Sequence, residues 1–331
     1  MGCEHPNHVE DKDLNTSQNE NLQLNTLPEN EEIESNSFPS ELNHALRNKY
    51  RQISITPIKF FEISDDEFNS ILNRNIFVQD ILKLYSPQIN EIEYELDIKF
   101  KDINPIKVLD PEGGIQYYKG SFNKEGKCHG KGIWIKDYNI YSGNFRNDEF
   151  HGIGLFIAEH GDYYFGQWKN SQCNGYGSLM IDKKLVYQGN FKNSKKEGYG
   201  EEKYPDGNMY KGNFYDGQKN GRGQYIFADG SRYDGNFKNS KYNGFGQLSL
   251  EGGHFIRGNF KDGKLNGEGN FNWSDGSKFV GNFIDDKKNG EGIYIWKDGK
   301  SYKGMWNNDD PYGEGLFKDP IRGNQESIIL D

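Results

Sequence analysis

Residues 206–237 read DGNMYKGNFYDGQKNGRGQYIFADGSRYDGNF, and this stretch decides the fold. Tyr210, Gly212 and Phe214 stand two residues apart, and the same Tyr-x-Gly-x-aromatic pattern returns 23 residues later at Tyr233. Residues at i, i+2 and i+4 lie on one face of a β-strand. Glycine normally weakens a strand, so its regular presence requires a reason. The stretch therefore predicts β-hairpins in which each aromatic ring lies over a glycine of the neighbouring strand.

Two dipeptides predict the turns. Asp-Gly, as at Asp206-Gly207, supplies the conformation that a tight hairpin needs, and Asn-Gly, as at Asn220-Gly221, is expected in the turn at the other end of the hairpin. Each 23-residue unit is thus predicted to be one hairpin with a turn at either end.

The pattern is repeated nine times without a change of spacing, which identifies a repeat architecture. Its central glycines are Gly120, Gly143, Gly166, Gly189, Gly212, Gly235, Gly258, Gly281 and Gly304. The aromatic residues two positions before and after them are Tyr118, Phe122, Tyr141, Phe145, Tyr164, Trp168, Tyr187, Phe191, Tyr210, Phe214, Tyr233, Phe237, Phe260, Phe279, Phe283, Tyr302 and Trp306. We expect these rings to supply the packing of the repeats. The alternative is that they line a trough that grips a partner helix or peptide.

These units resemble the MORN (membrane occupation and recognition nexus) repeat, whose pattern is Y-x-G-x-[WF] followed by G-x-G and often Asp-Gly. The resemblance covers roughly residues 115–318, with Ile256 and Phe279 replacing the leading tyrosine and Lys184 replacing a turn glycine. It implies a mostly β fold: an elongated, single-layer, twisted and trough-shaped antiparallel sheet of stacked hairpins. Such arrays are stabilised by contacts between neighbouring repeats and need capped ends.

Composition and charge separate the chain into parts. Aromatic residues reach 15% and glycines number 41, of which only Gly2 lies before residue 113. Residues 1–110 carry 21 Asp/Glu against 10 Lys/Arg, whereas residues 111–331 carry 29 against 30. The array is therefore nearly neutral and lacks the basic surface that nucleic-acid binding requires. We expect no nucleic-acid partner.

The chain is predicted to have four segments. Residues 1–38 are a disordered acidic arm, 39–110 a helix-plus-strand cap, 111–318 the nine repeats, and 319–331 a C-terminal tail. In the cap, Ser64 begins a helix whose apolar face continues to Tyr85, because Ser64 to Glu67 has the form of a capping box. Segments 92–100 and 107–109 are strand-like and are expected to cover the edge of the first repeat.

The face opposite the rings is polar in the middle of the array and apolar at its ends. We expect the cap helix to contact an apolar patch in the first two repeats, and residues 328–330 to fold back in the same way at the far end. The patch comprises Ile133, Ile135, Leu155 and Ile157. The alternative is that one end of the array contacts a partner protein or a second copy of the chain. Contact with a second copy would make the protein a homo-oligomer.

Catalytic and metal sites are not indicated. Cys128, His129, His151 and Cys173 occupy one repeat position, but neighbouring repeats are about 10 Å apart, too far for one zinc ion to collect all four. No nucleophile, base and orienting residue can be assembled. We therefore expect no enzyme activity, no metal and no cofactor.

The N-terminus carries one local motif. Gly2 and Cys3 are candidate sites for a myristoyl and a palmitoyl group, which together anchor a protein stably. No stretch of about 18 apolar residues is present and three cysteines do not form a disulfide framework, so we expect a cytoplasmic protein associated with a membrane or the cytoskeleton.

The function expected from this resemblance is a non-enzymatic scaffold that organises protein partners at a membrane or a cytoskeletal, including ciliary, structure. Two alternatives remain open. The array is a direct phospholipid-binding module that recruits the protein to membranes, or the chain is a regulatory subunit of a lipid kinase. Fold alone does not choose between them.

Overall fold

The computed structural model describes residues 60–74, 104–109, 114–321 and 324–330. The chain divides into two units, Met1–Glu34 and Ser35–Asp331, and all described residues belong to the second. The expected acidic arm, the strand-like segment 92–100 and the acylation candidates Gly2 and Cys3 lie outside the described residues. Within the described part, no helix is long and apolar enough to cross a bilayer.

The described residues of the second unit form one 21-stranded sheet, with a short helix at its N-terminal end. The elements are β1 Phe60–Glu62, α3 Asp65–Leu72, β2 Ile106–Leu109, β3 Ile115–Phe122, β4 Cys128–Lys136, β5 Asn139–Arg146, β6 Glu149–Ile157, β7 Tyr163–Lys169, β8 Gln172–Ile181, β9 Lys184–Lys192, β10 Lys195–Lys203, β11 Met209–Tyr215, β12 Gln218–Ile226, β13 Arg232–Lys238, β14 Lys241–Ser249, β15 Phe255–Lys261, β16 Lys264–Asn272, β17 Lys278–Ile284, β18 Lys287–Ile295, β19 Ser301–Asn307, β20 Asp310–Asp319 and β21 Asn324–Leu330.

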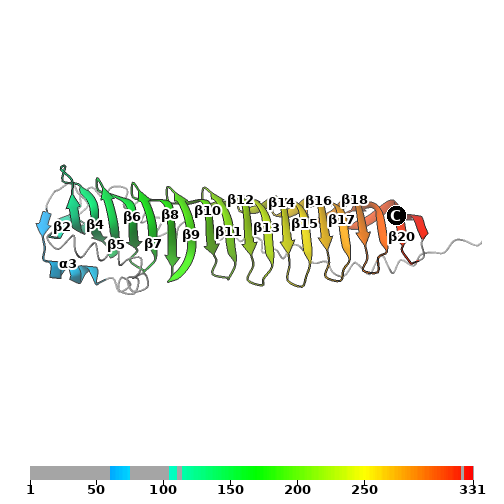
Figure 1. Ribbon diagram of the computed structural model, residues 1–331, viewed down its shortest axis with the longest axis horizontal. Coiled ribbons are helices and arrows are strands. Elements are labelled where there is room, and N and C mark those ends of the chain that lie inside the picture. The colour runs from blue at the N-terminus through cyan, green and yellow to red at the C-terminus, as the bar shows by residue number, and fades with distance from the viewer. Residues whose placement is uncertain (1–59, 75–103, 110–113, 322–323, 331) are drawn as a thin grey trace, which may run out of the picture. The chain divides into compact units, whose positions relative to one another are not determined.

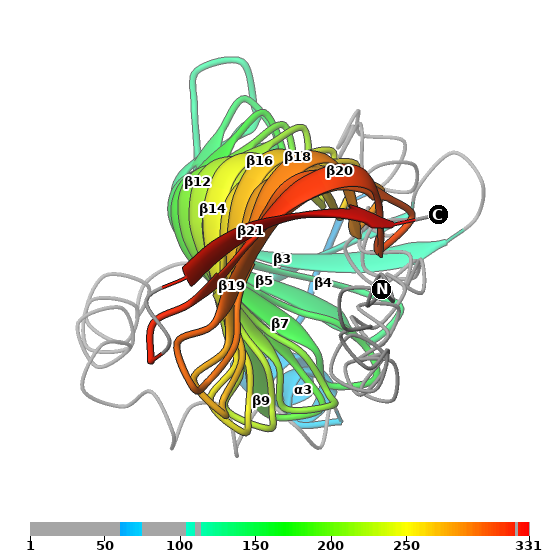
Figure 2. The same cartoon turned by 90° about the vertical axis from the view of Figure 1, so that its right-hand side faces the viewer.

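Each strand pairs antiparallel with the next strand of the sequence, so the hairpins stack in chain order (Figure 1). Viewed along the stack, the strands are curved and follow one another with a steady rotation, which is the twist expected of a β-sheet (Figure 2). The predicted mostly β fold of stacked hairpins is confirmed, and strands β3 to β20 are the two strands of each of nine repeats.

Two kinds of turn connect the strands. Between β10 and β11, the N–H of Gly207 donates to Tyr204 O at 3.1 Å and Gly207 has φ +93°, as glycine allows. Between β11 and β12, both central residues have positive φ, with Asp216 at +49° and Gly217 at +88°, which matches the strand twist of a two-residue hairpin. The Asp-Gly prediction is therefore confirmed for the first kind.

The Asn-Gly dipeptides are not turns, and that prediction is wrong. Gly221 lies inside β12 with φ +84°, where the register shifts between Gly212 and Phe214 of the neighbouring β11. This is a β-bulge, which adds residues to one strand and bends it. The true turn lies four residues earlier, at Asp216-Gly217, because Asp and Asn also tolerate the left-handed conformation.

Successive repeats are joined by hydrogen bonds that the sequence analysis did not anticipate. The N–H of Ser240, in the turn after β13, donates to Lys219 O at 2.9 Å, and the Ser240 Oγ accepts from the Lys219 N–H at 3.2 Å. Cys173 and Ser194 are linked in the same way. Each such turn therefore closes onto the repeat before it, as nearest-neighbour stabilisation requires.

The N-terminal edge of the array is covered by β1 and β2. β2 pairs with β3, with Ile106 opposite Tyr118, and β1 pairs with β2. α3 begins after Ser64, whose side chain accepts a hydrogen bond from Glu67 N at 3.1 Å, so the predicted N-cap is confirmed. The helix ends at Leu72, and the predicted continuation beyond residue 74 lies outside the described residues.

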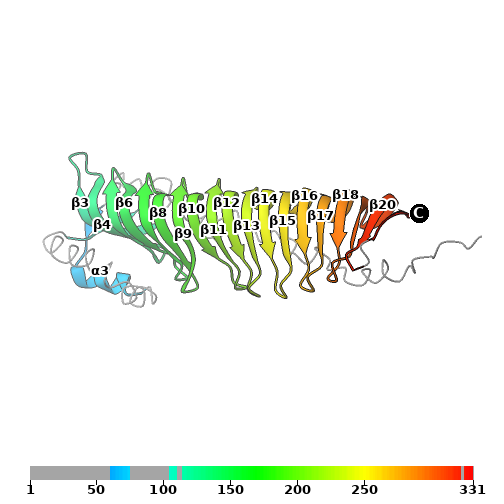
Figure 3. The same cartoon turned by 45° about the vertical axis from the view of Figure 1, so that its right-hand side comes forward.

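The C-terminal segment does not fold back over the opposite face as expected. Instead it forms β21, which pairs with β20 and extends the sheet by one strand (Figure 2), at the end of the stack that carries the C-terminus (Figure 3). Ile328 lies opposite Gly315, and Ile329 is 78% exposed. This pairing satisfies backbone donors and acceptors that β20 would otherwise leave exposed at the edge of the sheet.

Candidate functional site

The aromatic side chains of the repeat pattern form the core of the array. Of the seventeen predicted residues, only Phe122 is substantially exposed, at 40%, and Tyr141, Tyr187, Tyr210 and others are fully buried. We call this side of the sheet the aromatic face. Because its rings are enclosed, they supply packing between repeats and do not offer an open trough to a partner.

In every repeat that has a leading ring, this ring lies over a pair of glycines. A Cβ on Gly223 would lie 2.4 Å from the Tyr210 hydroxyl oxygen and 2.6 Å from two atoms of its ring. The hydroxyl donates to Asn213 O at 2.9 Å, and the rings of Phe214 and Phe237 stand edge-on to Tyr210 at 5.1 and 5.0 Å. The predicted stacking of rings on bare glycines is therefore confirmed, and burial raises the pKa of Tyr210 above its ordinary range.

Lysines enter this core at one repeat position. The Lys219 ammonium lies 4.9 Å from the centre of the Tyr225 ring, and burial lowers its pKa. Lys196, at the equivalent position, pairs with the buried carboxylate of Glu202, which also accepts a hydrogen bond from Tyr204. These charges are enclosed by rings and stabilised by cation–π attraction and ion pairing, so we assign them a structural role.

Two of the candidate metal ligands, Cys128 and Cys173, lie in the core of the array. Cys128 and Cys173 are free and fully buried, and burial raises the pKa of both thiols. Among the described residues, no group of three or more His, Cys, Asp and Glu side chains could hold a metal ion. The two thiols behave as small apolar side chains of the core.

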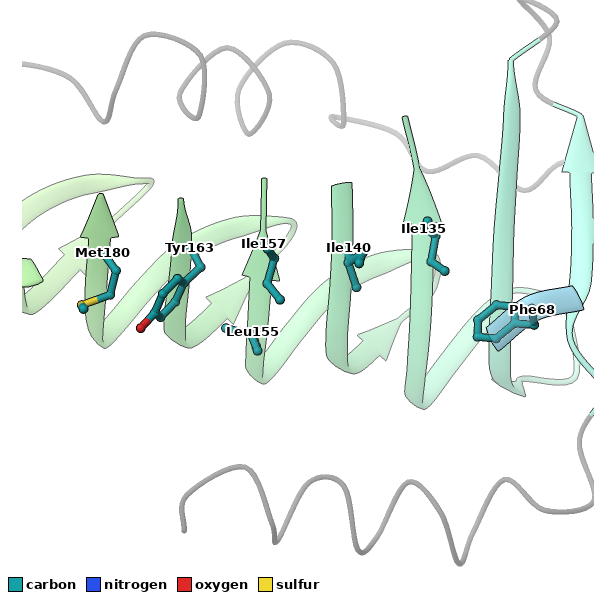
Figure 4. Close-up of a cluster of buried hydrophobic side chains, with 7 residues drawn as sticks. All are labelled: Phe68, Ile135, Ile140, Leu155, Ile157, Tyr163 and Met180. Carbon is teal, nitrogen blue, oxygen red and sulfur yellow. The ribbon is translucent and has the colours of Figure 1, made fainter. Parts of the chain in front are cut away.

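The predicted cap-contact residues lie together on the opposite face. Ile135, Leu155 and Ile157 form one buried cluster with Phe68 of α3, and Ile133 packs against its margin (Figure 4). Phe68 is 1% exposed, and the Lys119 ammonium contacts Asp65 Oδ1 of the first helical turn at 2.7 Å. The helix thus packs against the apolar patch of the first repeats, mainly through Phe68.

A row of variable residues on the opposite face is the feature that sequence reasoning missed. Each member is the middle residue of a G-x-G, and we call the set the G-x-G row. It comprises Lys131, Ile153, Tyr176, Tyr199, Arg222, Phe245, Glu268, Glu291 and Glu314. Four large apolar members are about half exposed: Ile153 at 52%, Tyr176 at 53%, Tyr199 at 56% and Phe245 at 48%. The sequence alone could have identified this row, because the residue between the two constant glycines differs from repeat to repeat and is therefore not required by the fold.

The backbone of the row is held rigidly. The Asn190 side-chain amide donates to Tyr199 O at 3.3 Å, and Asn213 donates to Arg222 O at 3.1 Å. The bulge glycine before each row residue has positive φ, and the core glycine after it has a ring on the far side. The row side chains therefore stand at fixed positions two strands, or about 10 Å, apart.

At the C-terminal end the row borders a groove of about 620 Å³ on the opposite face across β16 to β20. Val280, Ile293, Met305 and Leu316 supply apolar side chains to its lining. The row residues on these strands are acidic, so the row changes from apolar in the middle of the array to negative at its end.

Comparisons with known proteins agree with the repeat pattern. The family model described as the MORN repeat matches more than half of the chain, at residues 118–136, 141–162, 164–180, 187–209, 210–232, 233–254, 257–278 and 279–301. These are eight matches, and the ninth predicted repeat follows them with the same ring-over-glycine contact, since a Cβ on Gly304 would lie 2.3 Å from the Tyr302 hydroxyl. No curated protein matches the chain in sequence.

Solved structures align only weakly. The TCP domain of SAS-4 (dCPAP) of Drosophila Melanogaster, in complex with a proline-rich motif of Ana2 (dSTIL), is 10% identical over 54% of this chain and 85% of that chain, with a TM-score of 0.29. A mutant TCP10 domain of Danio rerio CPAP is 12% identical over 68% of this chain and 99% of that chain, with a TM-score of 0.30. At these scores the similarity carries no conclusion about this chain.

Proposed function

The chain belongs to the MORN-repeat family, and on that premise we propose that it is a non-enzymatic scaffold that holds a protein partner on its G-x-G row. The binding surface is the stripe formed by Ile153, Tyr176, Tyr199 and Phe245, together with Arg222 between them. We call it the apolar stripe.

The exposure of the apolar stripe is the observation that supports this proposal. All repeat rings of the aromatic face except Phe122 are buried, yet these four large side chains are about half exposed on the opposite face. Exposed apolar groups gathered along one line mark interaction sites, and tyrosine, phenylalanine and arginine are enriched in protein interfaces. From β6 to β14 the stripe extends over roughly 38 Å, long enough for an extended or helical partner segment.

The rigidity of the stripe favours a scaffold. Because the amides of Asn190 and Asn213 fix the neighbouring backbone, the side chains keep their spacing without a partner. A surface that is already ordered loses little conformational entropy on binding. The array can therefore present several contacts in fixed order to one partner, or to two partners along its length.

The experiment is affinity isolation of the full chain from cells that express it. The double variant Tyr176→Ser/Tyr199→Ser removes the centre of the apolar stripe, and Tyr215→Ser is the matched control because Tyr215 is 65% exposed beside a turn outside the stripe. We expect recovery of the bound protein to fall at least tenfold for the double variant and to be unchanged for the control. An unchanged set of bound proteins with a folded double variant would contradict the proposal.

The place where the scaffold acts forms a second part of the proposal. Acylation of Gly2 and Cys3 would anchor the chain to a membrane, because two acyl chains give stable attachment where one does not. Metabolic labelling with myristate and palmitate analogues tests it, with Gly2→Ala as the control. We expect the variant to lose both label and membrane association, and an unlabelled wild-type chain would leave a cytoskeletal structure as the proposed site.

A further inference from the structure

The groove at the C-terminal end of the array has an acidic wall. Glu268, Glu291 and Glu314 all line it, and all three are exposed members of the G-x-G row on β16, β18 and β20. Their strands are two apart, so the carboxylates follow one another at intervals of about 10 Å. The Lys303 side chain is the one cation among the described residues that line the groove. The groove is therefore net negative.

The groove also exposes apolar side chains. Val280 is 44% exposed and Leu316 is 42% exposed, and Ile293 and Met305 lie between them in the lining. A complementary occupant must bring apolar side chains for the floor and cations for the glutamates. An acidic or purely polar segment would be repelled or would leave the floor exposed.

One segment of this chain has that chemistry. Residues 42–61 contain no Asp or Glu, although residues 1–110 as a whole carry 21. The segment holds four cations, Arg47, Lys49, Arg51 and Lys59, and its apolar residues include Leu46, Tyr50, Ile53 and Ile55. The sequence before residue 42 is acidic. Within residues 1–61, the combination of cations and apolar side chains that complements the groove is therefore confined to this segment.

The segment cannot reach the groove of its own chain. It leads into β1 at the N-terminal edge of the sheet, and β16 is fifteen strand positions away along the stack, roughly 72 Å (Figure 1). The 18 residues from position 42 to β1 span at most about 65 Å when fully extended. Arg51, nine residues from β1, reaches only about 30 Å.

We propose that the basic segment of residues 42–59 binds the acidic C-terminal groove of a second copy of this chain. The N-terminal end of one array is thereby joined to the C-terminal end of the next. The two surfaces differ, so the contact is heterologous and propagates into an open head-to-tail assembly unless its rotation closes a ring. The proposal uses a different surface from the apolar stripe and stands independently of partner binding there.

Sedimentation velocity of the full chain tests the proposal over a range of protein and salt concentrations. We expect wild-type chains to assemble beyond the 38.1 kDa monomer at low salt and to associate at least tenfold more weakly at about 0.5 M salt, because exposed ion pairs are screened. Glu268→Lys/Glu291→Lys in the groove and Arg47→Glu/Arg51→Glu in the segment should each give monomers. Combining all four substitutions should restore assembly. Glu251→Lys, in an exposed loop away from the groove, is the control that should assemble as the wild type does.

The outcomes separate this proposal from its competitors. Monomeric wild type at every concentration would overturn it, and so would assembly that survives both charge reversals, since pairing through the exposed strand β21 does not depend on these charges. If the groove reversal fails to fold, judged by circular dichroism, Glu268→Gln/Glu291→Gln replaces it and should weaken assembly at least tenfold. The stripe variant Tyr176→Ser/Tyr199→Ser should still assemble, so failure of the proposed scaffold function and failure of assembly are distinguishable.

Discussion

A methyl group added to Gly223 should destabilise the array far more than the same group added to Gly269. The two glycines occupy the same repeat position, 46 residues apart. At Gly223 the new Cβ would meet three atoms of the Tyr210 side chain at 2.4 to 2.6 Å. At Gly269 the nearest atoms are on Phe283 at 3.1 Å and Leu265 at 3.3 Å, because Ile256 replaces the tyrosine in that repeat.

The magnitude follows from whether the neighbour can move. The Tyr210 ring is fully buried, stands against two phenylalanine rings and donates a hydrogen bond to Asn213 O. Displacing it combines overpacking with a weakened buried hydrogen bond, so Gly223→Ala should cost about 3 kcal/mol. At Gly269 a shift of a few tenths of an ångström suffices, and the loss of glycine flexibility in the unfolded chain offsets part of the strain. Gly269→Ala should cost about 1 kcal/mol or less.

The assay must be local, because long repeat arrays do not unfold as one cooperative unit. Hydrogen exchange of amides in β11 to β13 should lose protection by about two orders of magnitude in Gly223→Ala, whereas exchange in β15 to β17 of Gly269→Ala should change less than about tenfold. In a Tyr210→Ile background, which copies repeat seven, the cost of Gly223→Ala should fall by about 2 kcal/mol. Equal costs at the two glycines, or a cost unchanged by removal of the ring, would refute the ring-over-glycine account.

Three further predictions follow from the packing. Burial raises the pKa values of the enclosed tyrosines, among them Tyr141. Their contribution to the free energy of unfolding is therefore fully present below the unfolded pKa of about 10 and is lost as the pH rises above it. A spectrophotometric titration should show tyrosinate appearing together with unfolding, not before it. Ser240→Ala removes the Oγ that accepts a hydrogen bond from Lys219 N, while the backbone of residue 240 keeps its positive φ of 63°. Chemical denaturation should show a loss of about 1–2 kcal/mol in the free energy of unfolding. Ser240→Gly should cost less, because glycine relieves the backbone strain. Phe68→Ala should release α3 at a cost of about 3 kcal/mol, seen as faster exchange in α3 and in the cluster around Leu155, with β11 to β20 unchanged.

The strand register was predictable because two-residue periodicity assigns every side chain to a face. Once Tyr210, Gly212 and Phe214 share a face, the opposing glycine of the next strand follows from the 23-residue repeat. The turns were harder, since Asn-Gly is common both in turns and in bulges. Only the pairing of β11 with β12 shows that Gly221 lies within a strand, and that pairing depends on the Asp216-Gly217 turn four residues earlier.

The candidate site was harder to predict than the fold for a physical reason. The recurrent rings were the candidate binding residues, but recurrence marks what each repeat needs for its own stability, and all of those rings except Phe122 are buried. The G-x-G row escaped notice because its members share no chemistry. The segment of residues 42–59 escaped notice because the net charge of residues 1–110 conceals one basic run within an acidic region.

The buried rings and the exposed G-x-G row lie on opposite faces of the same sheet. The two glycines of each G-x-G are fixed by the bulge and by the ring that lies over the second glycine, so they cannot vary. The residue between them points to the other side of the sheet, and it is tyrosine at 199, arginine at 222 and glutamate at 291. A chain of identical hairpins can therefore carry different binding chemistry at each step of about 10 Å. On the proposed function, partners are selected by the positions that deviate from the repeat rather than by those that define it.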